Sequence, residues 1–141
     1  MNSTVLELSH EGTVLHSAVS GPLEFPVMVF ESVGPIHHAV NVPFHDSQAR
    51  GKAILIHTGW SDRWGSPAYD EPGPYLHEDL VFRFIRARVA LVGLDFGRVD
   101  ATALFEKKIA VVENLRGLMV VPKWGARFRI EPSPVRACCL R

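Results

Sequence analysis

Residues 53–100, AILIHTGWSDRWGSPAYDEPGPYLHEDLVFRFIRARVALVGLDFGRVD, decide the fold of this chain of 141 residues. The run AILIH at 53–57 is apolar up to its last residue, which is typical of a strand buried on both faces of a sheet. The loop 58–75 that follows is rich in tryptophan, tyrosine and proline, so we expect it to be stiff and aromatic. A second apolar run, VALVGLD at 89–95, predicts another buried strand.

A helix is predicted between these two strands. Leu80, Phe84 and Ile85 fall on one face at helical spacing, and arginines occupy the other face. The helix is expected to begin near residues 76–77, because the acidic residues that follow suit the positive end of the helix dipole.

Further elements are expected on both sides of this segment. Strands are expected at 3–9, 37–42, 109–115, 127–132 and 133–140, a second helix at 101–108, and either a strand or a short helical turn at 26–34. Short apolar strands that alternate with about two helices indicate an α/β fold.

The composition is that of a globular protein, with 47% hydrophobic and 21% charged residues. Fifteen basic residues balance fifteen acidic ones, so the charge favours no nucleic acid or anionic membrane as a partner. No apolar run reaches the roughly 18 residues that span a bilayer, and we expect a cytoplasmic location. The adjacent Cys138 and Cys139 make no disulfide framework, which fits a reducing compartment.

The order of the motifs resembles the cyclase family, the metal-dependent hydrolases that include bacterial kynurenine formamidase and isatin hydrolase. The matching motifs are HTGW at 57–60, WGSPAY at 64–69, LVGLD at 91–95, ENL at 113–115 and SPVRA at 133–137. The resemblance implies a swivelling β/β/α domain with a mixed sheet, a small-molecule substrate and a homo-oligomer. We expect residues 1–141 to form a single cyclase-like domain, shortened at its N-terminus relative to the family.

The resemblance also implies a metal site. Family members hold a divalent ion, such as Zn or Mn, with an H-x-G-T-H-x-D-x-P-x-H motif, a later His and the Glu of the ENL segment. Here His10, Gly12 and Thr13 match the opening of the motif, His16 stands where its Asp belongs, and Glu113 matches the Glu. The residues that this comparison assigns to metal are His10, His16 and Glu113, a set that would leave one position open for a water molecule.

This ligand set departs from the family pattern. Val14 and Ser20 stand where the motif has histidines, and the later His falls on Ala101. Two other placements stay open: LELSH at 6–10 as the family's opening D-L-S-H strand, or NVPFH at 41–45 as the D-x-P-x-H half. If the metal assignment is wrong, the histidines are ordinary loop residues and Glu113 caps or pairs at a strand end.

A substrate pocket is expected near the aromatic loop. Trp60, Trp64 and Tyr69 would stack against a flat aromatic substrate, or else close the core over the sheet edge. Asp95, at the end of a strand, would lie near the pocket or cap the turn that follows it.

Two functions from different classes fit these features. The first is a metal-dependent hydrolase, similar to kynurenine formamidase, that cleaves an amide-type C–N bond of a small aromatic or cyclic substrate. The second is a non-catalytic relative that retains the fold for binding or assembly. The resemblance assigns no catalytic residue beyond the metal ligands.

Overall fold

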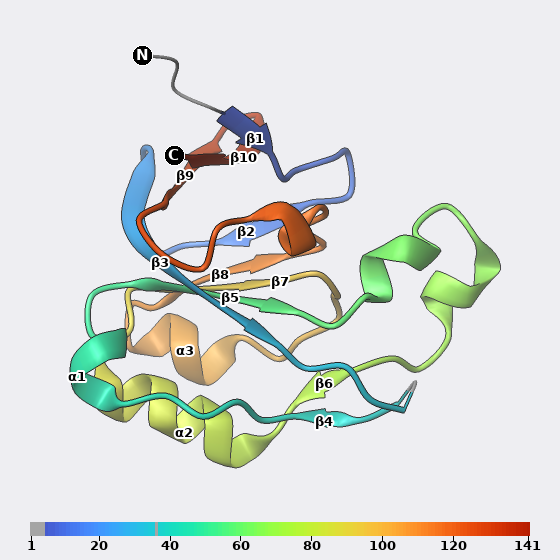
Figure 1. The fold of residues 1–141 in the computed structure, drawn as a ribbon, viewed down its shortest axis with the longest axis horizontal. Coiled ribbons are helices and arrows are strands. Elements are labelled where there is room, and N and C mark those ends of the chain that lie inside the picture. Colours follow the sequence, from blue (N-terminus) through green and yellow to red (C-terminus); the bar gives the residue numbers. More distant parts are fainter. Residues whose placement is uncertain (1–4, 36) are drawn as a thin grey trace.

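A computed structural model describes residues 5–35 and 37–141. An eight-stranded mixed sheet in the order β1-β10-β9-β3-β5-β7-β8-β2 forms its framework (Figure 1). Four neighbouring strands run parallel: β3 (Leu23–Glu31), β5 (Ala53–His57), β7 (Leu91–Leu94) and β8 (Ala110–Glu113). The flanking strands are antiparallel to their neighbours: β1 (Val5–Glu7), β2 (Val14–His16), β9 (Arg127–Pro132) and β10 (Val135–Leu140).

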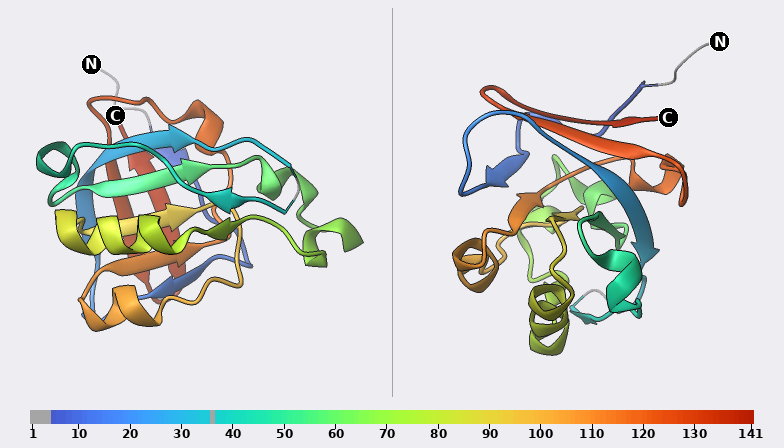
Figure 2. Two further views of the ribbon diagram at one scale, coloured as in Figure 1. Left: turned by 90° about the horizontal axis from the view of Figure 1, so that it is seen from below. Right: turned by 90° about the vertical axis from the view of Figure 1, so that its left-hand side faces the viewer.

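The sheet curls so that its β1-β10-β9 end folds over one face of the parallel strands (Figure 2). Three α-helices cover the opposite face: α1 (Asp46–Ala49), α2 (Glu78–Ala87) and α3 (Thr102–Glu106). Short 3-10 helices lie in the connections, at η1 (Trp60–Arg63), η2 (Pro67–Asp70) and η3 (Leu118–Val120). A separate parallel pair joins β4 (Ala39–Val40) to β6 (Tyr75–Leu76). The expected α/β class with a mixed sheet is confirmed.

Strand β5 shows why the sheet is covered on both faces. Its side chains alternate, so Ile54 and Ile56 pack into the core beneath the helices. Ala53 and Leu55 pack into a second core, beneath the folded-over strands. All four of these residues are fully buried, which confirms the strand expected from the apolar run.

Helix α2 begins where its capping groups predict. The ring of His77 accepts a hydrogen bond from the backbone N–H of Asp79 at 3.0 Å, which satisfies one of the free donors of the first turn. Leu80 and Phe84 are buried, as the helical spacing predicts. The helix ends at Arg88, whose positive φ of 59° stops the helical hydrogen-bond pattern.

Several elements differ from expectation. Of the two alternatives at 26–34, the strand is found, but it ends at residue 31 and forms the second part of β3. The strand expected at 37–42 is reduced to the two residues of β4, which pair outside the main sheet. Strand β2 and the one-turn helix α1 were not expected from the sequence, because each is too short to carry a periodic pattern. Residues 3 and 4 of the first expected strand lie outside the described residues.

None of the helices in the described part of the chain is long and apolar enough to cross a membrane.

The lack of a side chain at Gly93 lets the second core close. A methyl group built there would lie 2.5 Å from Leu55 Cδ2 and 2.9 Å from Leu115 Cδ1. We therefore expect Gly93→Ala to lower the free energy of unfolding by about 1–3 kcal/mol, measured by denaturant titration. In a Leu55→Ala background, where the space beside residue 93 is empty, Gly93→Ala should lower the free energy of unfolding by less than it does in the native chain. Equal costs in the two backgrounds would contradict this account of the packing.

Candidate functional site

A cavity of about 370 Å³ opens beside the carboxyl ends of the parallel strands. Apart from His37, its lining comes from the segments that follow three of these strands, namely the loop after β5, Phe96 to Arg98 after β7, and Asn114 after β8. Ligands of open α/β sheets bind at this edge, because the loops that leave neighbouring strands diverge there. The cavity is therefore the candidate site.

Aromatic rings form one wall of the cavity. Trp60, Trp64 and Tyr69 all line it, as the sequence suggested. Tyr69 contacts both indoles, edge-on to Trp64 with ring centroids 4.9 Å apart and tilted to Trp60 at 6.2 Å. Trp60 is almost fully buried, whereas Trp64 is 40% exposed. Trp64 therefore keeps ring surface that a ligand can cover.

The turn that contains His10 packs against the ring of Trp64. The imidazole of His10 packs on the Trp64 ring with centroids 4.2 Å apart. A side chain on Gly12 would overlap the same indole, since a Cβ there would lie 2.0 Å from it. The Nδ1 atom of His10 accepts a hydrogen bond from the Gly12 N–H at 3.0 Å. Burial, together with the nearby Arg116 charge, lowers the pKa of His10 and so favours its neutral form.

Asp95 holds the start of the aromatic loop. Its carboxylate accepts hydrogen bonds from the Thr58 N–H at 2.9 Å, the Gly59 N–H at 2.8 Å and the Thr58 hydroxyl at 2.6 Å. Burial raises the pKa of Asp95, although these three donors oppose the shift. The side chain is fully buried and is not part of the cavity lining. Asp95 thus connects the end of β7 to the loop that follows β5.

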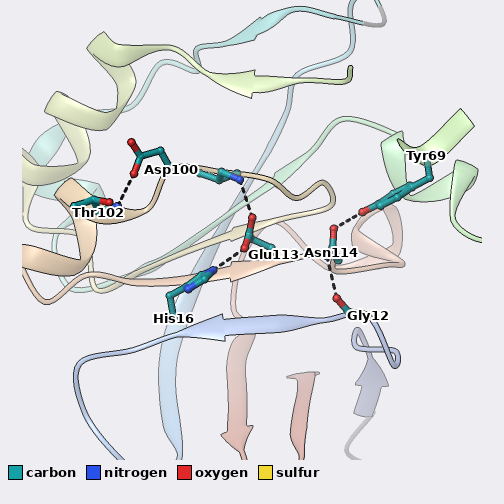
Figure 3. A network of polar contacts seen from close by, with 8 residues as sticks. Gly12, His16, Tyr69, Asp100, Thr102, Glu113 and Asn114 are labelled. Carbon is teal, nitrogen blue, oxygen red and sulfur yellow. Dashed lines mark hydrogen bonds and ion pairs between the residues drawn. The ribbon is translucent and has the colours of Figure 1, made fainter. Parts of the chain in front are cut away.

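Asn114 joins the two sides of the site (Figure 3). Its side-chain oxygen accepts a hydrogen bond from the Tyr69 hydroxyl, and its amide donates to the Gly12 carbonyl at 2.9 Å. The Thr13 hydroxyl donates to the backbone oxygen of Asn114 at 2.9 Å. Burial raises the pKa of Tyr69, and the nearby carboxylates of Asp95 and Glu113 add to the effect, so the phenol stays protonated as a donor.

Glu113 and His16 form a hydrogen-bonded pair next to this network (Figure 3). The Nε2 atom of His16 lies 2.6 Å from Oε2 of Glu113. The other carboxylate oxygen, Oε1, accepts the backbone N–H of Val99 at 2.8 Å. Both oxygens of the buried Glu113 are therefore engaged within the chain, and the pair links β2, β8 and the loop after β7.

The structure brings together two of the three residues assigned to metal. His16 and Glu113 are in contact, while His10 lies in the turn under Trp64. Within residues 5–35 and 37–141, no three His, Cys, Asp or Glu side chains are arranged as ligands of one metal ion. The donor set as it stands does not fit the metal centre that the family resemblance implies.

Two contributors to the site were not recognised in the sequence. Asn114 follows the ligand Glu in the ENL motif, and its positive φ of 63° is a conformation that asparagine tolerates better than most residues. Arg98, also at positive φ, lies at the rim, and its guanidinium donates to the Asp70 carbonyl at 2.9 Å. A polar residue directly after a buried strand was the available signal for Asn114.

Comparison with solved structures agrees with this fold. An isatin hydrolase bound to the product analogue thioisatinate superposes with a TM-score of 0.68 at 17% identity, over 84% of this chain and 60% of that one. Isatin hydrolase A from Ralstonia solanacearum gives 0.67 at 18% identity, over 83% and 60%. A potential metal-dependent hydrolase with cyclase activity gives 0.60 at 13% identity, over 99% and 98%. The chain thus spans about 60% of the length of the two isatin hydrolases.

The curled mixed sheet gives this chain the α/β fold that is seen in these structures. Residues 36–101 match the family model described as Putative cyclase. This match, together with the structural neighbours, supports the cyclase-family assignment made from the sequence. No curated protein matches the sequence.

The role assigned to Asp95 can be tested by removing its acceptors. We expect Asp95→Ala to lower the free energy of unfolding by at least about 2 kcal/mol, because two buried N–H groups lose their partner. Asp95→Asn is the matched control: its oxygen can accept both N–H groups while its amide donates to the Thr58 hydroxyl. Its cost should stay below about 1 kcal/mol, measured by denaturant titration. Equal losses in the two variants would show that the hydrogen bonds are not the cause.

Proposed function

We propose that this protein binds a small, flat aromatic or cyclic molecule in the cavity, without the metal-based hydrolysis implied by its family. One observation carries the proposal: the aromatic cavity is built and supported, whereas His16 and Glu113 bond to each other and the second Glu113 oxygen bonds to the backbone. This corresponds to the non-catalytic alternative that the sequence left open.

The cavity supplies the groups that such a ligand needs. The exposed part of Trp64 offers ring surface for stacking, with Tyr69 set edge-on against it. The guanidinium of Arg98 at the rim is 71% exposed, so it can donate hydrogen bonds to a carbonyl or carboxylate on the ligand. A volume of about 370 Å³ lies within the range of small-molecule sites.

Hydrolysis by a bound metal ion needs donors that are free to face it. A catalytic zinc ion is usually held by three protein ligands and keeps a fourth position for water. Here only His16 and Glu113 come together, and they face each other. To hold a cation at Oε2, Glu113 would have to give up its contact with His16 Nε2, the atom that would itself be needed as a ligand.

A metal-dependent hydrolase acting on an amide-type C–N bond is the second candidate. It is favoured by the contact between His16 and Glu113, which join two of the residues assigned to metal from distant parts of the chain. Similar folds occur in isatin hydrolases and in structures described as metal-dependent hydrolases. Zn or Mn would be the cofactor in that case.

Binding is tested by calorimetric titration with isatin as a flat bicyclic probe. We expect one site per chain, and Trp64→Ala should weaken binding about 10-fold or more because the stacking surface is lost. The matched control is Trp124→Ala, since Trp124 is 73% exposed and does not line the cavity. Wild-type affinity in the Trp64→Ala protein, or equal losses in the two variants, would refute the proposed site.

An assay of isatin hydrolysis distinguishes the two candidate functions, ligand binding and metal-dependent hydrolysis. Isatin incubated with the protein and added Zn²⁺ or Mn²⁺ should show no ring opening above that with metal alone, because the described residues offer no third ligand beside His16 and Glu113. Ring opening that Glu113→Gln abolishes would instead establish the hydrolase. Absorbance of isatin and its ring-opened product follows the reaction.

A further inference from the structure

Positions 14, 16 and 113 share one face of the β2–β8 pair. Val14 lies directly opposite Glu113, and His16 lies opposite Val111. Because side chains alternate along a strand, the residues at 14, 16, 111 and 113 point to one side of this pair. The intervening Leu15 packs toward the second hydrophobic core, on the other side.

This register explains how His16 reaches Glu113. The two residues are diagonal neighbours across the strands, at a separation that only long side chains bridge. Their contact at 2.6 Å shows that both side chains lean toward a common point. Position 14 is closer still, because directly opposed residues have Cβ atoms about 4.5–5.5 Å apart.

Val14 lies beside the contact between His16 and Glu113 but supplies no third electron-pair donor there. Its side chain is hydrocarbon and cannot ligate a cation, and the residue is 42% exposed, so a larger side chain has room. Ala101, where the family pattern expects the later histidine, lines the same open groove as His16. Val14 and Ala101, two of the positions where the family pattern has a histidine, therefore lie near His16 and Glu113.

We propose that His16 and Glu113 form an incomplete metal site, and that a donor at position 14 alone would complete it for a divalent cation of the zinc type. Two imidazoles and one carboxylate are a ligand set that Zn²⁺ accepts, with one position left for water. In the native chain the pair instead acts as a structural link, with His16 bound to one oxygen of Glu113 and the Val99 N–H to the other. This inference does not depend on ligand binding in the aromatic cavity.

The test is a titration with Co²⁺, whose absorption spectrum reports tetrahedral coordination, followed by displacement with Zn²⁺. Wild-type protein should show no stoichiometric binding. Val14→His should bind about one ion per chain, at least about 100-fold more tightly than wild type, since one missing ligand costs at least as much as a lost supporting contact. Val14→Cys also offers a ligand in nearly the volume of valine, and it should bind if the larger imidazole disturbs the strand.

Matched controls separate a site from a surface histidine. Val120→His places the same side chain on an exposed valine of η3 and should bind no better than wild type. Adding Glu113→Gln to Val14→His should abolish the tight binding, because the amide keeps an acceptor for Val99 but loses the charge. Circular dichroism and thermal unfolding verify that each variant is folded.

Two results would overturn the inference. One is stoichiometric binding by the wild-type chain, which would mean that the native donors suffice. The other is binding by folded Val14→His and Val14→Cys that is no tighter than by Val120→His, which would mean that the three positions do not converge. Both results are independent of the isatin titration, so failure of one proposal is distinguishable from failure of the other.

Discussion

Buried polar side chains at the carboxyl edge of the parallel strands need hydrogen-bond partners, and Asp95, Glu113 and Asn114 find theirs within the chain. Asp95 at the end of β7 receives the backbone and hydroxyl donors of the loop after β5. Glu113 at the end of β8 receives His16 and Val99, and the next residue, Asn114, bonds to Tyr69 and Gly12. An unpaired donor or acceptor in such a place costs about 1–3 kcal/mol, so these contacts decide where the surrounding loops lie.

These hydrogen bonds also determine which kinds of ligand the site can bind. A loop anchored at its base by Asp95 and braced through Tyr69 by Asn114 presents fixed aromatic rings, which favours recognition of a flat molecule. The direct contact between Glu113 and His16 occupies the atoms that the two side chains would otherwise offer to a cation between them. The polar network that stabilises the pocket is thus also the reason why the geometry supports binding more directly than metal-based hydrolysis.

The elements with strong sequence signals are found where the signals indicated. The apolar run of β5 and the alternating run of β9 match the structure residue for residue, and the cap and apolar face of α2 were also correct. Short elements without a period were missed, and β2 is the important case. Its three residues become a strand because β8 offers hydrogen-bond partners, a cause that no local pattern reveals.

The site residues, too, were predicted well where a local pattern sets their position and poorly where long-range contacts do. The aromatic residues Trp60, Trp64 and Tyr69 line the cavity, as loop residues after a buried strand are expected to do. Asp95 is turned beneath the loop instead, because its carboxylate meets more donors there than in the open cavity. His10 lies under Trp64, a placement that depends on the missing side chain of Gly12 and on the turn that Thr13 holds against Asn114.

The amino-acid sequence by itself determined the α/β class, the central buried strands and the aromatic character of the loop, because apolar periodicity and residue type express themselves locally. Only the tertiary structure decided which polar side chains meet. The pairing of His16 with Glu113 joins residues 97 positions apart and depends on strand register, which long-range hydrogen bonds and core packing set together.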